Sequence, residues 1–254
     1  MNYFTASKCL AMTIFLFLPI KAGFAQGVEE QPVEPHRYEC LIEPAVEIDL
    51  STSVAGVIKL INGDRGTPVK RGQVLVRLEA TTELAAVELA KAKLEFGQRK
   101  VARTKELFRE KFASEYSVDE AETETRLAEV ELEQAKAMLR LKTLRSPING
   151  IVVEKLADVG EFVADDEIMK LAQLDPLHVE VILPLEQINA IKKGMSATVY
   201  PSEPVGGEYK ARVIAVDKVL DAASGTFGAR LALPNPGSKL PAGMRCMVEF
   251  PEAE

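Results

Sequence analysis

The chain has 254 residues, with 31 Lys and Arg against 38 Asp and Glu and a formal net charge of −7. This acidic balance argues against a nucleic-acid-binding protein, because the phosphate backbone selects basic surfaces. Two histidines, three cysteines and no tryptophan leave little material for a metal cluster or a catalytic triad. Proline is absent between Pro68 and Pro147, which sets that stretch apart from the rest of the chain.

Residues 1–25 have the pattern of a secretory signal peptide. Lys8 precedes an apolar run over residues 9–20, and Gly23-Phe24-Ala25 supplies small residues for signal peptidase cleavage. The alternative is a membrane anchor, but this run is shorter than the roughly 20 residues that a helix needs to cross a bilayer. We therefore expect an exported, soluble protein.

Export would leave Cys40 and Cys246 in a compartment where disulfides persist. The two residues could form a disulfide between an early strand and the last strand. They could also be two small side chains buried separately in strands. The distance between their Cα atoms decides between these alternatives, and a sequence does not supply it.

Strand and turn patterns surround the proline-free stretch. Residues 26–45 read as a polar lead-in, with a strand near residues 38–42 at its end. Residues 46–80 and 146–174 contain β-branched runs broken by glycine and proline, and the second segment repeats the first at an offset of 94 residues. We expect the two copies to fold together into one small β-sandwich.

Paired glycines mark this repeat. Gly56 and Gly66 in the first copy match Gly150 and Gly160 in the second, and the members of each pair are ten positions apart. Glycine suits tight turns where another side chain would clash, so we expect all four to be turn residues.

Residues 81–145 predict an antiparallel helical hairpin. They are rich in good helix formers, and small and apolar residues recur at alternating spacings of three and four, as in coiled coils. A break is expected at residues 113–117, where Ser117 and Glu120 form a capping-box pattern. A solvated helical spacer without a partner is the alternative. The two stripes comprise Val87, Ala90, Leu94, Gly97, Val101, Thr104 and Phe108, and Ala121, Thr125, Ala128, Leu132, Ala135 and Leu139.

The order of these segments resembles the periplasmic adaptor family, the membrane fusion (HlyD-like) proteins of efflux pumps. The opening of the second half, Arg145–Val152, is similar to the family, as are Pro176–Val181 and Leu240–Met244 in its β-barrel domain. The resemblance implies a mixed β fold with a long α-helical hairpin. It comprises a split lipoyl-like (barrel-sandwich hybrid) domain with an antiparallel coiled-coil insert, followed by a small β-barrel over residues 175–254.

The resemblance also implies a contact site at the hairpin tip. Arg103, Leu107 and Ser114 have a spacing similar to that of adaptors that dock on TolC-like outer-membrane channels. Leu107 would be an apolar anchor, Arg103 a planar fork of donors, and Ser114 a helix cap or an interface hydroxyl. Ordinary alternatives are a core leucine, a solvated charge and a cap alone.

The function implied by the resemblance is a non-enzymatic periplasmic adaptor for small-molecule efflux, without a cofactor. It would associate peripherally with the inner membrane through a transporter, RND rather than ABC, and would form a ring of copies, a hexamer by the resemblance. Family members commonly continue into a membrane-proximal domain. Since this sequence stops at Glu254, we expect a transporter contact of the kind made by that domain to be either absent or made by the barrel.

Three other functions are alternatives to an adaptor. A lipoyl or biotin carrier needs a lysine on the turn between the halves, but Met169-Lys170-Leu171 lies in the second half and the hairpin occupies that turn. An enzyme is disfavoured because His36 and His178 have no partners at metal or triad spacing. A periplasmic coiled-coil tether without a pump remains the main alternative.

Overall fold

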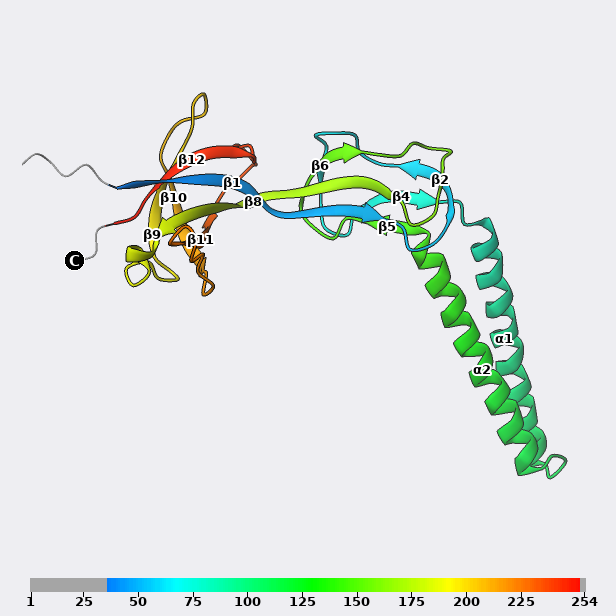
Figure 1. Cartoon of the computed structure of the whole chain (residues 1–254). Helices are drawn as coiled ribbons and strands as arrows, with labels where there is room; N and C mark the ends of the chain where they lie inside the picture. Colours follow the sequence, from blue (N-terminus) through cyan, green and yellow to red (C-terminus); the bar gives the residue numbers. More distant parts are fainter. Residues whose placement is uncertain (1–35, 252–254) are drawn as a thin grey trace, which may run out of the picture. The chain divides into compact units, whose positions relative to one another are not determined.

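The computed structural model describes residues 36–251, and in the order of the chain one pair of long helices lies between two groups of strands (Figure 1). The expected signal peptide, residues 1–25, lies outside the described residues. The helices are α1 (Thr81–Arg109), α2 (Glu115–Leu141) and the short 3-10 helix η1 (Leu185–Gln187). The strands are β1 (Arg37–Ser51), β2 (Gly56–Ile61), β3 (Pro68–Val69), β4 (Val74–Leu78), β5 (Thr143–Arg145), β6 (Gly150–Lys155), β7 (Phe162–Val163), β8 (Glu167–Pro184), β9 (Ser196–Pro201), β10 (Tyr209–Val216), β11 (Thr226–Leu233) and β12 (Met244–Glu249).

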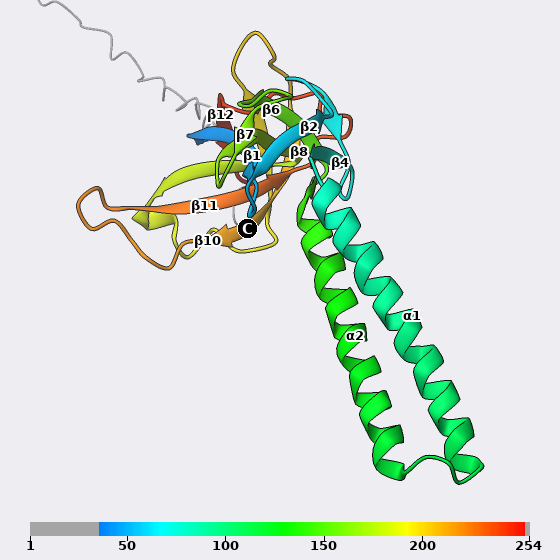
Figure 2. The same cartoon turned by 90° about the vertical axis from the view of Figure 1, so that its right-hand side faces the viewer.

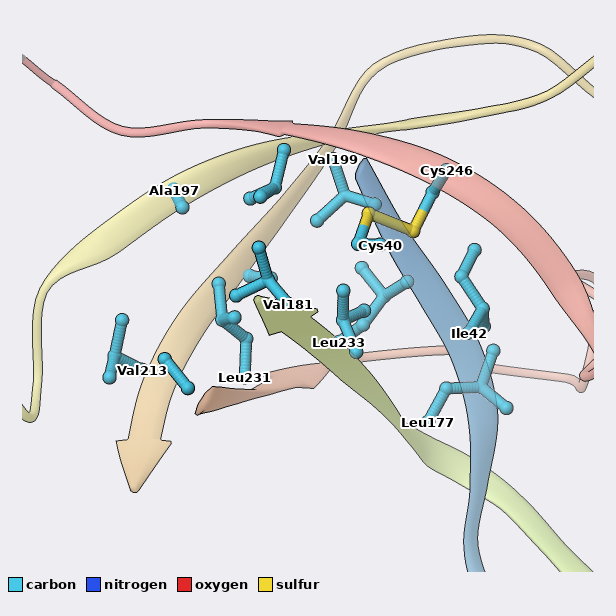
Figure 3. Packing of buried hydrophobic residues seen from close by; sticks show 14 of the residues in the cluster. Cys40, Ile42, Leu177, Val181, Ala197, Val199, Val213, Leu231, Leu233 and Cys246 are labelled. Atoms are coloured by element: carbon cyan, nitrogen blue, oxygen red, sulfur yellow. A yellow bond between two sulfur atoms is a disulfide. The ribbon is translucent and has the colours of Figure 1, made fainter. Parts of the chain in front are cut away.

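Six strands close a barrel in the order β1, β12, β9, β10, β11 and β8, and β8 pairs back onto β1. Alternate residues of each strand face the interior, as the two-residue period of a strand requires. On β8 these are Val179, Val181 and Leu183, and on β11 they are Leu231 and Leu233, all fully or almost fully buried. Figure 3 shows several of these aliphatic side chains converging inside the barrel.

Strands β1 and β8 are shared between two domains. The β1–β8 ladder covers residues 40–44 of β1 in the barrel and, after a register shift between Pro44 and Val46, residues 46–51 in the sandwich. The strand expected near residues 38–42 is confirmed, but it is part of the long strand β1, so the lead-in expected over residues 26–45 is corrected from Arg37 onward. Residues Arg37–Ile42 pair with β12 because Cys40 and Ile42 point into the barrel core. The barrel thus needs a strand that precedes the predicted range 175–254.

The sequence repeat is a structural repeat, with each half pairing into the other. Strand β2 pairs with β7, and the equivalent strand β6 pairs with β3. The backbone N–H of Gly66 donates to the Val152 carbonyl, and that of Gly160 donates to the Ile58 carbonyl, both at 2.8 Å. Both bonds connect positions that are equivalent at the offset of 94 residues. Neither half completes its hydrogen bonding alone, which confirms the split lipoyl-like sandwich.

A buried hydroxyl group opens each half. Thr52 and Ser146 are both 2% exposed and are equivalent in the repeat. The Thr52 hydroxyl donates to the Val54 carbonyl at 2.8 Å, and the Ser146 hydroxyl donates to the Ile148 carbonyl at 2.7 Å. These local bonds satisfy the hydroxyl groups inside the core and turn the chain into the next strand.

The four repeat glycines have two different roles. Gly66 and Gly160 have φ values of +86° and +95°, so they are turn residues in the left-handed region. Gly56 and Gly150 begin strands instead, which corrects the expectation that all four lie in turns. At Gly150 a Cβ atom would lie 2.0 Å from the Ala172 carbonyl oxygen on β8, so close backbone approach requires glycine.

The predicted hairpin occupies the connection between β4 and β5, where α1 and α2 pack along each other (Figure 2). Its buried residues belong to the predicted stripes: Ala90 and Gly97 on α1, and Ala121 and Leu132 on α2. A Cβ atom on Gly97 would lie 2.7 Å from Thr125 Oγ1, so the helices approach closely there. The structure confirms a coiled-coil hairpin.

The turn of the hairpin falls earlier than the predicted break at residues 113–117. Helix α1 ends at Arg109, and Ser114 is the N-cap of α2. The Ser114 hydroxyl oxygen accepts from the Ser117 backbone N–H at 3.1 Å. The capping box predicted at Ser117 and Glu120 is wrong, because Ser117 already lies in the first turn of α2. Ser114 has the extended backbone that an N-cap requires.

Candidate functional site: the hairpin tip

Large apolar side chains gather at the tip of the hairpin and are exposed. Phe112 is 79% exposed and Tyr116 is 74% exposed, while Leu107 and Phe108 are 39% and 44% exposed. They occupy the last turn of α1, the connecting turn and the first turn of α2. Exposed apolar groups clustered in this way mark interaction surfaces.

The backbone of the tip is well defined, although its side chains are exposed. The Phe112 N–H donates to the Leu107 carbonyl at 2.8 Å, and the Lys111 N–H donates to the Phe108 carbonyl at 3.0 Å. These bonds end α1 in the manner of a C-terminal capping turn, with Lys111 at a φ of 65°. The tip can therefore present Phe112 and Tyr116 from a defined backbone.

The three predicted contact residues all lie toward the tip end of the hairpin. Arg103 and Leu107 are exposed one helical turn apart on α1, and Ser114 follows the connecting turn. The Ser114 hydroxyl is engaged by the Ser117 N–H and lies 2.8 Å from the Ser117 hydroxyl. Ser114 thus has a capping role, and a contact role for any of the three stays a prediction.

Three aromatic residues at the tip were missed by the sequence interpretation. Phe108 was assigned to the buried stripe of α1, but it is 44% exposed, in the last turn of α1. Phe112 and Tyr116 were not assigned a role. Their signal was available: Phe112 directly precedes the expected break and Tyr116 lies within it, in an insert otherwise rich in alanine and charge.

Charges below the tip hold the two helices together. Lys100 contacts Glu124 and Lys105 contacts Glu122 across the hairpin. The hydrogen bond to the Glu124 carboxylate raises the pKa of the Lys100 ammonium group. Exposed pairs of this kind contribute only about 0.2–1 kcal/mol each, so they favour one register more than they add stability.

The other candidate chemistry does not converge on a site. Among residues 36–251, no group of three His, Cys, Asp or Glu side chains could hold a metal ion. His178 lies on β8, where burial and the nearby Arg230 lower the pKa of its imidazole. Lys170 lies within strand β8 and is 3.7 Å from Asp49, so it is not the exposed turn lysine of a carrier domain.

Cys40 and Cys246 face each other on β1 and β12 and are joined by a disulfide bond (Figure 3). Their Cα atoms are 4.8 Å apart, a separation that a disulfide can bridge. The bond lies in the wall of the barrel and connects residues 206 positions apart in the sequence. It therefore joins the first barrel strand to the last.

Two family profiles match the chain. Residues 47–173 match the CzcB-like barrel-sandwich hybrid domain, and residues 176–254 match the CusB-like beta-barrel domain. The chain belongs to the membrane fusion protein family, the periplasmic adaptors of efflux pumps. This family consists of non-enzymatic linkers, and the resemblance drawn from the sequence is confirmed.

Individual relatives are distant. The chain is 26% identical over 204 residues to the cobalt-zinc-cadmium resistance protein CzcB of Cupriavidus metallidurans, covering 72% of this chain and 38% of CzcB. It is 26% identical over 224 residues to the multidrug resistance protein MexA of Pseudomonas aeruginosa, covering 80% of this chain and 57% of MexA. The chain thus spans about half the length of these relatives.

The fold is shared with a solved structure. The MacA–MexA chimeric protein that contains the Pseudomonas aeruginosa MexA α-hairpin domain superposes with a TM-score of 0.74 and 23% identity, covering 87% of this chain and 79% of the chimera. Within residues 36–251, no helix is long and apolar enough to span a membrane.

Proposed function

We propose that this chain is a periplasmic adaptor that links an inner-membrane transporter to an outer-membrane exit channel and so supports efflux of small molecules. The observation that carries this function is the apolar hairpin tip on a chain of the adaptor family. Several relatives are named as efflux pump periplasmic linkers, including BepD of Brucella suis. The predicted signal peptide supports a periplasmic location.

The exposed side chains of the hairpin tip support the proposed contact with an outer-membrane channel. Leu107, Phe112 and Tyr116 would be buried against a channel, and Arg103 would bind a carbonyl or carboxylate group beside them. Apolar anchors surrounded by polar residues are the usual composition of a binding hot spot. The barrel would face the transporter, for which the similarity to CzcB and MexA favours the RND class.

A ring of copies, six by the family resemblance, would complete the passage. In a ring, each copy presents two different faces to its two neighbours, and the repeated contact closes on itself. This assembly supplies a conduit and requires no catalytic residue, which agrees with a non-enzymatic family.

Export measurements with tip variants test this function. Leu107→Asp and Phe112→Asp should each abolish channel-dependent export, because a buried carboxylate without a partner opposes the tip contact. Val130→Asp is the matched control, since Val130 is an exposed apolar residue in the middle of α2. Cells that carry the Val130→Asp variant should export at the wild-type level.

Wild-type export by both tip variants, at normal protein levels, would contradict the proposed tip contact. Deletion of the whole protein distinguishes the adaptor from the alternative of a tether without a pump. A tether without a pump predicts altered envelope integrity with unchanged export, whereas the adaptor predicts loss of export.

A further inference from the structure

The hairpin carries a second stripe, in which apolar and charged side chains alternate and which its own two helices leave largely exposed. Leu89 and Phe96 are each 62% exposed on α1, and Leu127 is 61% exposed on α2. They belong to rows with alternating spacings of three and four, which is the spacing of a coiled-coil seam. The second stripe comprises Leu89, Lys93, Phe96 and Lys100 on α1, and Glu124, Leu127, Glu131, Gln134 and Met138 on α2.

The two rows of the second stripe lie on the same side of the hairpin. Lys93 contacts Glu131 at 2.9 Å, and Lys100 contacts Glu124, so the rows run side by side. Phe96 lies three residues after Lys93, and Leu127 three residues after Glu124, which places both at one height between the ion pairs. Apolar and ionic levels therefore alternate along this face.

A groove between the helices opens on the same face. It has a volume of about 290 Å³. Leu89, Met138 and three alanines line it, and Glu83, Lys93, Glu131 and Gln134 line it as well. Small residues between larger ones form the holes into which side chains of another helix insert. The alanines are Ala86, Ala90 and Ala135. The face is thus shaped for a helical partner with the same seven-residue period.

We infer that two copies of this protein pair through the second stripe, with their hairpins parallel, to form a four-helix bundle. A two-fold axis parallel to the hairpin sets α1 of one copy against α2 of the other. Each lysine then faces a glutamate of the second copy at its own height, and Phe96 faces Leu127 of the second copy. The surface is self-complementary, as a two-fold contact requires.

The charges exclude the opposite orientation. If the two tips pointed in opposite directions, α1 would face α1, and Lys93 would approach Lys100 of the second copy. The glutamates of the two α2 helices would meet in the same way. Like charges on facing helices are destabilising, so the ionic levels select the parallel pair.

This pair goes beyond the proposed function and does not depend on it. The opposite face of the hairpin is charged, and a groove there is lined by Asp119, Glu122, Arg126 and Glu129. In a ring with one repeated contact, the second stripe of one copy would meet that charged face of its neighbour, leaving Phe96 and Leu127 against polar groups. The pair is therefore a separate contact made by the free protein.

Charge exchange between two variants tests the pair. The acidic variant carries Lys93→Glu and Lys100→Glu, and the basic variant carries Glu124→Lys and Glu131→Lys. In sedimentation of the purified mature protein, each variant alone should associate with itself at least about tenfold more weakly than wild type, because every ionic level becomes repulsive. An equimolar mixture should recover a dimer, which a misfolded variant would not do.

The control exchange lies on the opposite face. Lys105→Glu alone and Glu122→Lys alone each break an exposed ion pair there, and each should leave the wild-type dimer unchanged. We expect a dissociation constant of about 1 μM for this pair. A wild-type protein that still sediments as a monomer at about 100 times that concentration would overturn the pair. A mixture that stays monomeric, or a control that dissociates equally, would also overturn it.

Cross-linking provides an independent test of the geometry. A mixture of Phe96→Cys and Leu127→Cys copies should form a covalent heterodimer with a short bifunctional maleimide. The matched mixture on the charged face, Gln98→Cys with Arg126→Cys, should not. Equal yields from the two mixtures would contradict the assigned face, whatever the outcome of export measurements.

Discussion

The body of the protein and its hairpin use apolar residues in opposite ways. In the barrel and sandwich, aliphatic side chains such as Leu171 and Leu177 are completely buried. In the two helices of the hairpin only Leu132 and three small residues are buried, whereas the hairpin residues Leu89, Phe96 and Phe112 are exposed. Burial in the body determines the fold, and exposure on the hairpin provides surface for recognition.

Backbone contacts show the same difference. At Gly150 the neighbouring atoms are backbone atoms of Ala172 and Gln173, which belong to a paired strand and cannot move freely. At Gly97 the nearest atom is the hydroxyl oxygen of Thr125, on a helix held by few buried groups. The body should therefore tolerate added volume much less than the hairpin.

The largest expected effect follows from Gly150→Ala. The new Cβ atom would lie 2.0 Å from the Ala172 carbonyl oxygen, so β6 and β8 would have to separate. We expect the free energy of unfolding to fall by about 3 kcal/mol or more, measured by urea denaturation. Gly66→Ala is the control, since it meets no atom within 4 Å and costs only the left-handed backbone, about 1–2 kcal/mol.

A smaller effect is expected from Gly97→Ala. Alanine improves helix propensity by about 1 kcal/mol, while the contact with Thr125 costs about 1–3 kcal/mol, so a net loss of about 1 kcal/mol is expected. Combining it with Thr125→Ala removes the nearest atom and should recover part of this loss in a double-mutant cycle. A loss as large as that of Gly150→Ala would show that the hairpin is packed as rigidly as the body.

The smallest effect concerns pH and the body alone. Burial, and then Arg230, lower the pKa of His178 in the folded state, while Glu180 and Glu43 act in the opposite direction. The unfolded chain therefore binds this proton at a higher pH, and stability falls as the pH drops below about 6.5. His178→Gln should flatten the stability profile between about pH 7 and 5. An unchanged slope would mean that other groups control it.

The sequence predicted the repeat and the hairpin because both depend on local spacing. Equivalent glycines and valines revealed two halves, and the spacing of small residues revealed the helix pair. The exchange of pairing between β2 and β7 and between β3 and β6 was not predictable, because strand partners depend on contacts distant in sequence. For the same reason, the sequence did not show that Arg37–Ile42 belong to the barrel.

The candidate site was only partly predictable. The family resemblance pointed to Arg103, Leu107 and Ser114, but the period of three and four assigned Phe108 to the buried stripe. A period identifies a face of a helix, and it does not show where the partner helix ends. The structure alone shows where the turn falls and that Phe108, Phe112 and Tyr116 are all exposed beside it.

The most direct test of the tip contact is photo-cross-linking in cells from Phe112, replaced by a photoreactive amino acid. Our account predicts an adduct between this position and an outer-membrane channel protein, and none from the same replacement at Val130. Equal adducts from both positions, or adducts at Phe112 that contain no outer-membrane channel in cells that export normally, would contradict the account.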